Sequence, residues 1–97
     1  MILAKAHIAG GRKLVAVCDS ELLGQRFEEK GLQIDLTGEF YRGEEADEGK
    51  LKRVLTDAYL ADFVGEKSVA FGIKNGTVKK ENVIKVSRVP RAQFFAV

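Results

Sequence analysis

Two consecutive glycines, Gly10 and Gly11, constrain the fold of this chain of 97 residues more than any other feature. Before them, residues 2–9 alternate, with Ile2 the first of the apolar positions on one side, and after them the run Lys13–Cys18 is rich in valine. Glycine readily adopts the positive φ angles of a two-residue hairpin turn, so the two runs are predicted to pair as an antiparallel hairpin. Both faces of the second run are apolar, which places that strand inside a sheet.

Size and composition indicate one folded domain. With 97 residues, of which 45% are apolar and 31% charged, the chain can build one hydrophobic core but not two. No apolar run approaches the roughly 20 residues that span a bilayer, and Lys5 and His7 interrupt the start of the chain before a signal-peptide core could form. We therefore expect a cytoplasmic protein. A single cysteine and a single histidine exclude an internal disulfide and argue against structural zinc, so we expect no cofactor and no metal.

Three segments carry the signals of helices. The first is predicted to begin at residue 19 or 20, where Asp and Ser can cap it, and to end near residue 30, before Gly31. The second follows a capping aspartate, and its apolar residues keep helical spacing over residues 47–62. The third covers residues 66–75, with Gly76 as its stop.

Further strands complete the prediction. Leu32–Thr37 alternates apolar and polar side chains, and Asn82–Val86 is a short apolar run. Pro90 cannot donate a hydrogen bond to a neighbouring strand, so Arg91–Val97 is predicted to be an edge strand or a tail. The sequence thus predicts a single α+β domain over residues 1–97. It would have a mixed or antiparallel sheet of about 4–5 strands that starts with the hairpin, and about three helices packed on one side.

Charge is distributed unevenly along the chain. Residues 19–48 contain ten acids and three basic residues, whereas residues 66–97 contain seven basic residues and two acids. If these segments lie on different surfaces, the molecule has one acidic and one basic end. The alternative is an evenly solvated surface.

Cys18 and His7 are the residues most often used in nucleophilic catalysis. Cys18 stands before a predicted helix start, where a thiolate would be stabilised. The hairpin, however, places His7 opposite Leu14, about 13 Å from Cys18 at the usual rise of a strand. A contacting pair is therefore excluded, and a buried, inert cysteine is the expected role.

Acidic residues cluster between residues 35 and 48. Carboxylates in this number could act as acid and base, or bind a cation, in a pocket beside Asp35, Thr37, Glu39 and Arg42. Their spacing does not match a calcium-binding loop. Acids at residues 44–48 have a simpler explanation, because they stabilise the N-terminus of the helix that follows.

The segment Gly38–Gly43 is unusual for a solvated turn, because it contains Phe40, Tyr41 and Arg42 between its glycines. The two aromatic side chains could cover the edge of the core while Arg42 pairs with an acid. Alternatively, Tyr41 and Arg42 face a ligand, and the guanidinium binds a phosphate or carboxylate through two hydrogen bonds.

The C-terminal part of the chain combines basic and aromatic residues, a combination used by proteins that bind nucleic acid. Its candidate binding residues are Lys85, Arg88, Arg91 and Gln93, followed by Phe94 and Phe95. In a strand these two phenylalanines point to opposite faces, so only one is expected to be free to stack on a base. The signature motifs of RNA-binding modules and the glycine-rich loops that bind nucleotides are absent from the sequence.

Four segments together resemble the archaeal domain-of-unknown-function 424 family. They are VCDSELLGQRFEE, LQIDLTGEFYRGEE, ADFVGEKSVAFGIKNG and ENVIKVSRVPRAQFF. The resemblance covers nearly the whole chain. It implies a small, single-domain archaeal cytoplasmic protein with an α+β fold, and it implies no particular activity.

The sequence favours a non-enzymatic binding module, with RNA or a ribonucleoprotein of the translation apparatus as its partner. The predicted binding residues are Tyr41, Arg42, Lys85, Arg88, Arg91 and Gln93. This hypothesis requires the basic tail and the Tyr-Arg turn to face solvent. The alternative is an enzyme with the carboxylate-lined pocket described above. A homodimer joined through the C-terminal edge strand is compatible with both.

Overall fold

The computed structural model describes residues 1–96, which form one compact α+β domain. Its two α-helices are α1 (Glu48–Leu55) and α2 (Glu66–Lys74), and two short 3-10 turns are η1 (Ser20–Leu22) and η2 (Lys80–Asn82). The strands are β1 (Ile2–Ala9), β2 (Arg12–Asp19), β3 (Arg26–Glu29), β4 (Leu32–Asp35), β5 (Glu44–Glu45), β6 (Leu60–Val64), β7 (Ile84–Val86) and β8 (Val89–Phe95). Within the described residues, neither α-helix has the length and apolar character needed to cross a membrane.

Six strands form a mixed sheet in the order β5-β1-β2-β6-β8-β7, and β3 and β4 form a separate two-stranded sheet. Only the pairing of β2 with β6 is parallel. The predicted hairpin is confirmed: β1 and β2 pair from Ala9↔Arg12 outward, and Gly10 and Gly11 form the turn with φ angles of 58° and 75°. The predicted mixed sheet is also confirmed, but it has six strands rather than the predicted four or five.

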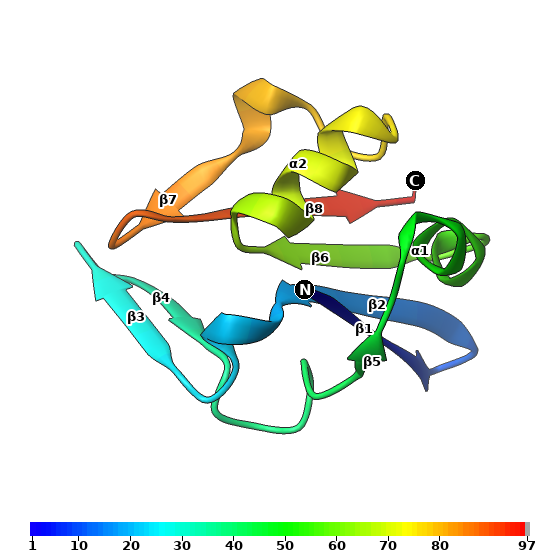
Figure 1. Cartoon of the computed structure of the whole chain (residues 1–97), viewed down its shortest axis with the longest axis horizontal. Helices are drawn as coiled ribbons and strands as arrows, with labels where there is room; N and C mark the ends of the chain where they lie inside the picture. The colour runs from blue at the N-terminus through cyan, green and yellow to red at the C-terminus, as the bar shows by residue number, and fades with distance from the viewer. Residues whose placement is uncertain (97) are drawn as a thin grey trace.

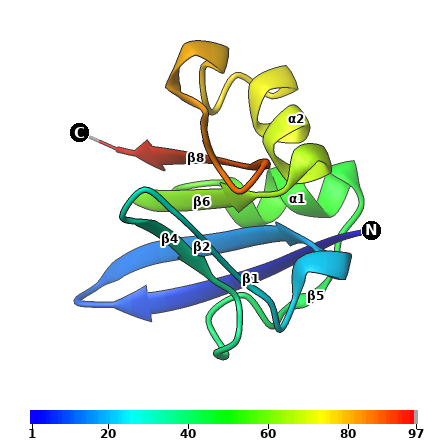
Figure 2. The ribbon, with the colours of Figure 1, turned by 90° about the vertical axis from the view of Figure 1, so that its left-hand side faces the viewer.

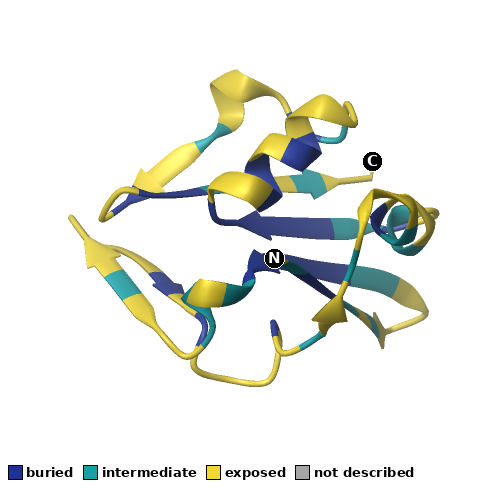
Figure 3. Ribbon diagram, in the orientation of Figure 1, coloured by how far each residue is buried: buried dark blue, intermediate teal, exposed yellow. Residues whose placement is uncertain are grey.

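The two faces of the large sheet are covered differently (Figures 1 and 2). Helices α1 and α2 cover one face, where Val15, Val17 and Phe63 form the centre of the core. The β3-β4 hairpin lies across part of the opposite face, where it contributes Ile34 to a second apolar cluster around Cys18. Figure 3 shows the consequence: β6 is buried along most of its length, whereas β3 is largely exposed.

The first predicted helix, from residue 19 or 20 to about residue 30, is wrong. This segment forms η1 and then β3, which pairs with β4. Lys30 and Gly31 have φ angles of 50° and 82°, so Gly31 belongs to a hairpin turn rather than to the end of a helix. The spacing of Leu23 and Phe27, four residues apart, fits one face of a helix, but it does not exclude a strand in so short a segment.

The second predicted helix begins as expected but ends early. Asp47 caps α1 by accepting a hydrogen bond of 2.8 Å from the Lys50 backbone N–H. The helix stops at Leu55, and Asp57 adopts a left-handed φ of 62°. The residues that follow form β6, which the sequence analysis missed because its apolar positions continue the helical spacing.

The remaining elements follow the prediction more closely. Helix α2 is confirmed, and β4 and β7 are shorter versions of the predicted strands Leu32–Thr37 and Asn82–Val86. The predicted edge strand Arg91–Val97 begins earlier, at Val89, and is not at an edge at Arg91, where β8 pairs with both β6 and β7. From Ala92 to Phe95 it pairs with β6 alone among the described residues, as expected. Pro90 is tolerated because its missing N–H falls at the end of β6, beside Gly65. Val97, the last residue of the predicted strand, lies outside the described residues.

Asp19 and Gly65 join the end of β2 to the start of α2. The buried Asp19 carboxylate accepts hydrogen bonds from the backbone N–H of Lys67, at 3.0 Å, and of Ser68, at 2.8 Å, and a third from the Ser68 hydroxyl. It therefore satisfies donors that the first turn of a helix leaves free. Gly65 precedes the helix with a φ of 109°, and a Cβ there would lie 2.4 Å from Asp19 Cγ.

Replacing Gly65 with alanine is expected to lower the free energy of unfolding by about 2–4 kcal/mol, because the added methyl group collides with Asp19 in a backbone region that alanine rarely adopts. Gly10→Ala is the matched control, since Gly10 also has a positive φ but nothing lies within 4 Å of its added Cβ. The control should lose only about 1 kcal/mol. Urea unfolding of both variants measures the difference, and equal losses would contradict the role of Asp19.

Candidate functional site

The centre of the candidate site is Asp62, a carboxylate in the middle of β6 with 3% of its surface exposed. Arg91, on the neighbouring strand β8, donates two hydrogen bonds to it, from Nε to Oδ1 at 3.1 Å and from Nη2 to Oδ2 at 3.0 Å. The Tyr41 hydroxyl donates a further hydrogen bond to Oδ2. These three side chains, the Asp62 cluster, join β6, β8 and the loop after β4.

The charged and polar groups of the Asp62 cluster are paired with one another. Burial disfavours the charged form of Arg91, but the hydrogen bonds and the charge of Asp62 outweigh it and raise the pKa of the guanidinium. Burial, followed by the charge of Asp62, raises the pKa of the Tyr41 hydroxyl well above its usual value. Tyr41 thus stays protonated at neutral pH, and the positive charge of Arg91 is offset by a neighbouring carboxylate. The cluster therefore connects three elements of the fold and provides neither a nucleophile nor a free cation.

Cys18 lies beside this cluster and is buried as predicted. Its Sγ is 3.8 Å from the Tyr41 carbonyl oxygen. Burial, with smaller contributions from the charges of Asp19 and Glu21, raises the pKa of the thiol to about 11. His7 pairs with Leu14 in the hairpin, as expected, so no imidazole is available to activate this thiol.

The loop that carries Tyr41 is attached to β1 by polar and aromatic contacts. Lys5 Nζ donates a hydrogen bond of 3.0 Å to the Glu39 carbonyl oxygen. His7 Nε2 lies 2.9 Å from the Phe40 carbonyl oxygen, which can only accept, so this nitrogen carries the proton. The His7 and Phe40 rings are stacked, with centroids 4.6 Å apart. The loop is therefore attached to β1 at the two residues that precede Tyr41.

The structure places the six predicted binding residues in three separate regions. The buried Tyr41 and the half-buried Arg91 meet at Asp62, and Gln93 is exposed in the strand position opposite Asp62. Arg42 is exposed on the loop, 3.6 Å from Glu39. The last two residues are exposed elsewhere, on β7 and at the tip of the β7-β8 turn: Lys85 and Arg88.

The alternative pocket residues are all exposed. Asp35 accepts a hydrogen bond of 2.9 Å from the Thr37 backbone N–H and another from its hydroxyl. These bonds lower the pKa of Asp35. Glu39 instead faces Arg42, so the two carboxylates have separate partners. Among residues 1–96, no group of three or more His, Cys, Asp or Glu side chains is placed to hold a metal ion.

Asp62 is not among the site residues predicted from the sequence, although the sequence contains a signal for it. It is the only charged residue in the apolar run Leu60–Val64. An isolated acid within a buried strand requires a partner, because an unpaired buried charge is strongly destabilising. Recognising that run as a strand would have identified the acid.

Part of the sheet face opposite the helices is left uncovered. His7, Leu14, Leu60 and Phe95 are successive partners across β1, β2, β6 and β8, and we call these four residues the open row. None of the four is buried, and Phe95 has 52% of its surface exposed. Phe94 points to the helix side and packs on the core there, as the alternation of a strand predicted.

Cationic side chains accompany the open row. Arg12 lies on the same side of β2 as Leu14, and its guanidinium is 4.2 Å from the centre of the Tyr59 ring. Lys5 lies two residues before His7 on β1, on the same side of the sheet. The open row is thus an apolar and aromatic strip beside two positive charges.

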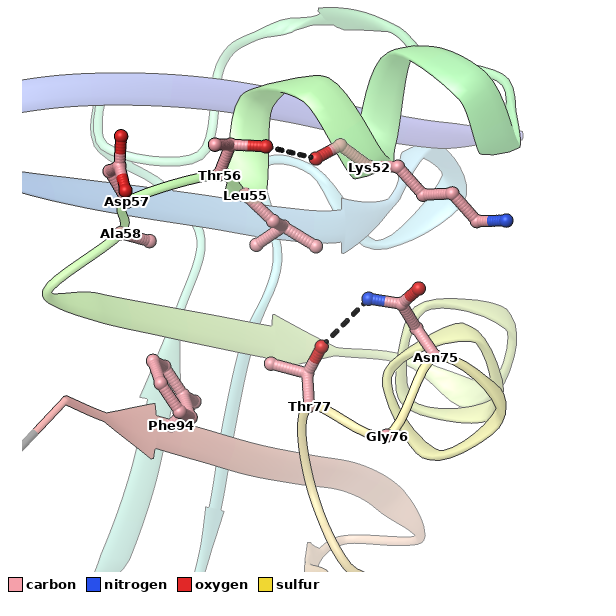
Figure 4. A pocket seen from close by; sticks show the side chains of 9 residues that line it. All are labelled: Lys52, Leu55, Thr56, Asp57, Ala58, Asn75, Gly76, Thr77 and Phe94. Carbon is pink, nitrogen blue, oxygen red and sulfur yellow. Dashed lines mark hydrogen bonds between the residues drawn. The ribbon is translucent and has the colours of Figure 1, made fainter.

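An open cleft of about 540 Å³ lies on the other side of the molecule, between the C-terminal ends of α1 and α2 (Figure 4). Polar side chains in its wall bind neighbouring groups of the protein. Thr56 Oγ1 donates to the Lys52 carbonyl oxygen at 3.0 Å, and Asn75 Nδ2 donates to Thr77 Oγ1 at 2.9 Å. These groups are therefore already satisfied and do not define a ligand site.

Comparisons with known proteins agree with this fold. The family described as "Protein of unknown function (DUF424)" matches residues 7–97, which confirms the resemblance seen in the sequence. A crystal structure of an uncharacterized conserved protein from Methanopyrus kandleri is similar, with a TM-score of 0.81 over 97% of this chain and 90% of that chain. Its sequence identity is 20%, so the likeness concerns the fold alone. No curated protein matches the chain.

Removing Arg91 from the Asp62 cluster is expected to be strongly destabilising. Arg91→Met should lower the free energy of unfolding by about 3–5 kcal/mol, because Asp62 then remains charged and buried without its cation. Tyr41→Phe should cost about 1.5–3 kcal/mol, the loss of one hydrogen bond to a charged group. Arg42→Ala is the control, since its ion pair is exposed, and should cost less than about 0.5 kcal/mol. Urea unfolding tests this order, and an equal loss in Arg91→Met and Arg42→Ala would contradict it.

Cys18 should make stability fall at alkaline pH. Its pKa in the folded protein, about 11, exceeds the ordinary value of 9.0, so the folded state favours the neutral thiol. The resulting stabilisation is complete below pH 9.0 and is lost as the pH rises towards 11. Urea unfolding between these pH values should therefore show a shallower decline in Cys18→Ala than in the unmodified protein. Parallel declines would show that this thiol does not titrate differently in the two states.

Proposed function

Because the chain belongs to the DUF424 family of proteins of unknown function, we propose a function from its own geometry: a non-enzymatic module that binds single-stranded RNA. The open row is the proposed surface. Bases stack on aromatic side chains while nearby cations neutralise phosphates, and stacking tolerates any base sequence. Single-stranded segments of RNA in the translation apparatus are therefore among the candidate ligands.

The observation that supports this proposal most directly is the pair of aromatic groups on an uncovered sheet face. Phe95 is half exposed at one end of the open row, and the stacked rings of His7 and Phe40 lie at the other. Neighbouring β-strands lie about 4.8 Å apart, and the two ends of the open row are three such spacings apart. The aromatic groups at the two ends can therefore contact different nucleotides of one RNA molecule.

The balance of charge on this face also favours an anionic ligand. Lys5 and Arg12 contribute positive charge, and two acids of this region are already paired, Asp62 with Arg91 and Glu39 with Arg42. Asp57 lines the same hollow as Arg12 and offsets part of its charge. This surface differs from the one that the sequence suggested. It does not include Tyr41 and Arg91, because these two side chains are bonded to Asp62. It includes His7, Phe40 and Arg12 instead.

Binding of fluorescein-labelled oligouridine of about ten nucleotides, followed by fluorescence anisotropy, tests the proposal. We expect saturable binding that weakens with salt, with a slope of about −0.7 in log affinity against log salt for each phosphate contacted. Arg12→Glu should weaken binding about tenfold and make this slope shallower, because it removes a phosphate contact. Phe40→Ala should also weaken binding, by about tenfold, through the loss of a stacking surface.

Lys52→Glu provides the matched control. It makes the same change of charge on α1, which covers the opposite face of the sheet. The control should bind oligouridine like the unmodified protein. Equal weakening in Lys52→Glu and Arg12→Glu, binding that does not respond to salt, or no binding at low salt would each refute the proposed surface.

A further inference from the structure

Beyond RNA binding, we propose that the outer edge of β8 accepts an extended acidic peptide of a partner protein as an added strand. The register of the large sheet provides the first argument. Strand β7 pairs with β8 only at Val89, Pro90 and Arg91, whereas β6 pairs with β8 as far as Phe95. Figure 1 shows the chain between α2 and β7 rising away from β8, whose second half continues towards the C-terminus. This half of β8 has a neighbouring strand on one side only.

The hydrogen bonds between β8 and β6 show which backbone groups of β8 face away from β6. The Pro90 carbonyl oxygen accepts from the Gly65 N–H at 2.9 Å, and the Ala96 N–H donates to the Tyr59 carbonyl oxygen at 2.8 Å. Backbone groups alternate along a strand, so those of the even-numbered residues face β6 and those of the odd-numbered residues face outward. Beyond the end of β7, the outward groups are the N–H and C=O of Gln93 and Phe95. Both residues thus present the donor and acceptor pattern that an added strand requires.

A shallow cavity marks the place where this strand would lie. It has a volume of about 300 Å³ and is lined by Asn82 and Ile84 on one side and by β8 on the other. Ile84 and Phe95 flank Gln93 on the same face of the sheet, with 45% and 52% of their surfaces exposed. An apolar side chain on the added strand would contact both. The backbone groups give affinity, and this apolar pair gives preference for an alternating peptide.

The positive charge of the segments around this edge favours an acidic peptide over a second copy of β8. Between Lys79 and Phe95 the chain has five basic residues and one acid, and within the described part of the chain only Arg91 among these basic residues is paired, with Asp62. Lys80 belongs to the same turn as Asn82, and Lys85 follows Ile84 in β7, so both are on the segments that line the cavity. A second copy of β8 would bring two such basic segments together, which is unfavourable. An acidic segment is attracted instead. The occupant is therefore a peptide that alternates apolar and acidic residues. It shares Phe95 with the RNA surface and leaves Lys5 and Arg12 free.

A fluorescein-labelled peptide of about six alternating valines and glutamates is the probe, and anisotropy is the measurement. Two further versions carry N-methyl groups on the backbone of every second residue, one on the odd positions and one on the even positions. Only one set of amides can face β8, so we expect one methylated peptide to bind like the unmodified peptide and the other to bind at least about tenfold more weakly. This comparison leaves the protein unchanged. Equal affinity of all three peptides, or no binding of any, would overturn the proposal.

Variants of the protein test the same edge from the other side. Gln93→Pro removes an outward N–H that has no partner on β6, so peptide binding should fall at least about tenfold while thermal unfolding confirms the fold. Gln93→Ala keeps the N–H and should bind normally. Lys85→Glu should weaken binding, whereas Arg12→Glu should weaken only the binding of oligouridine. Gln93→Pro that binds the peptide normally would overturn the proposal.

Two competing occupants give distinct results. If Gln93→Pro weakens the binding of oligouridine as much as that of the peptide, the edge belongs to the RNA site and the proposal is wrong. If molar mass from light scattering doubles with protein concentration and Gln93→Pro abolishes this, the edge joins two copies of the chain and the proposal is again wrong. A constant monomer mass together with peptide binding supports it. Failure of oligouridine binding alone affects only the proposed RNA surface.

Discussion

The buried charge of Asp62 is the constraint on which the arrangement of this domain depends. A carboxylate in the middle of a central strand is strongly unfavourable unless a cation and further donors reach it. Arg91 supplies the cation from β8, and Tyr41 supplies a hydroxyl group from a loop that is distant in sequence. The requirement therefore fixes the position of this loop against β6 and β8, as well as adding to the pairing of the two strands.

Fixing the loop has a consequence for the neighbouring surface. Because Tyr41 points inward, the adjacent Phe40 is directed towards β1, where it stacks on His7. Lys5 reinforces the same position from β1. The loop and the β3-β4 hairpin then cover one part of the sheet face as far as His7 and leave the rest of the open row uncovered. The internal ion pair thus shapes the external surface, although its own members contribute little charge to it.

Local signals in the sequence predicted those parts of the fold that depend on local physics. The Gly10-Gly11 turn, the Asp47 cap and the third helix each rest on backbone conformation or on hydrogen bonds between near neighbours. The errors arose where spacing was ambiguous. Leu23 and Phe27 fit a helix and a strand equally well, and the residues of β6 continue the spacing of α1. At these places the choice was made by partners distant in the chain, β4 in one case and β2 with β8 in the other.

By itself, the sequence determined the family, the α+β class, the initial hairpin, and the burial of a cysteine without a catalytic partner. It also determined that basic and aromatic residues accumulate near the C-terminus. Tertiary structure alone decided which of these charges remain free. Arg88 and Arg91 are both arginines of the same basic segment, yet one lies at an exposed turn and the other is paired with Asp62. The physical reason is that the solvation and pairing of a charge depend on groups brought together by strand pairing, and those groups are distant in the sequence.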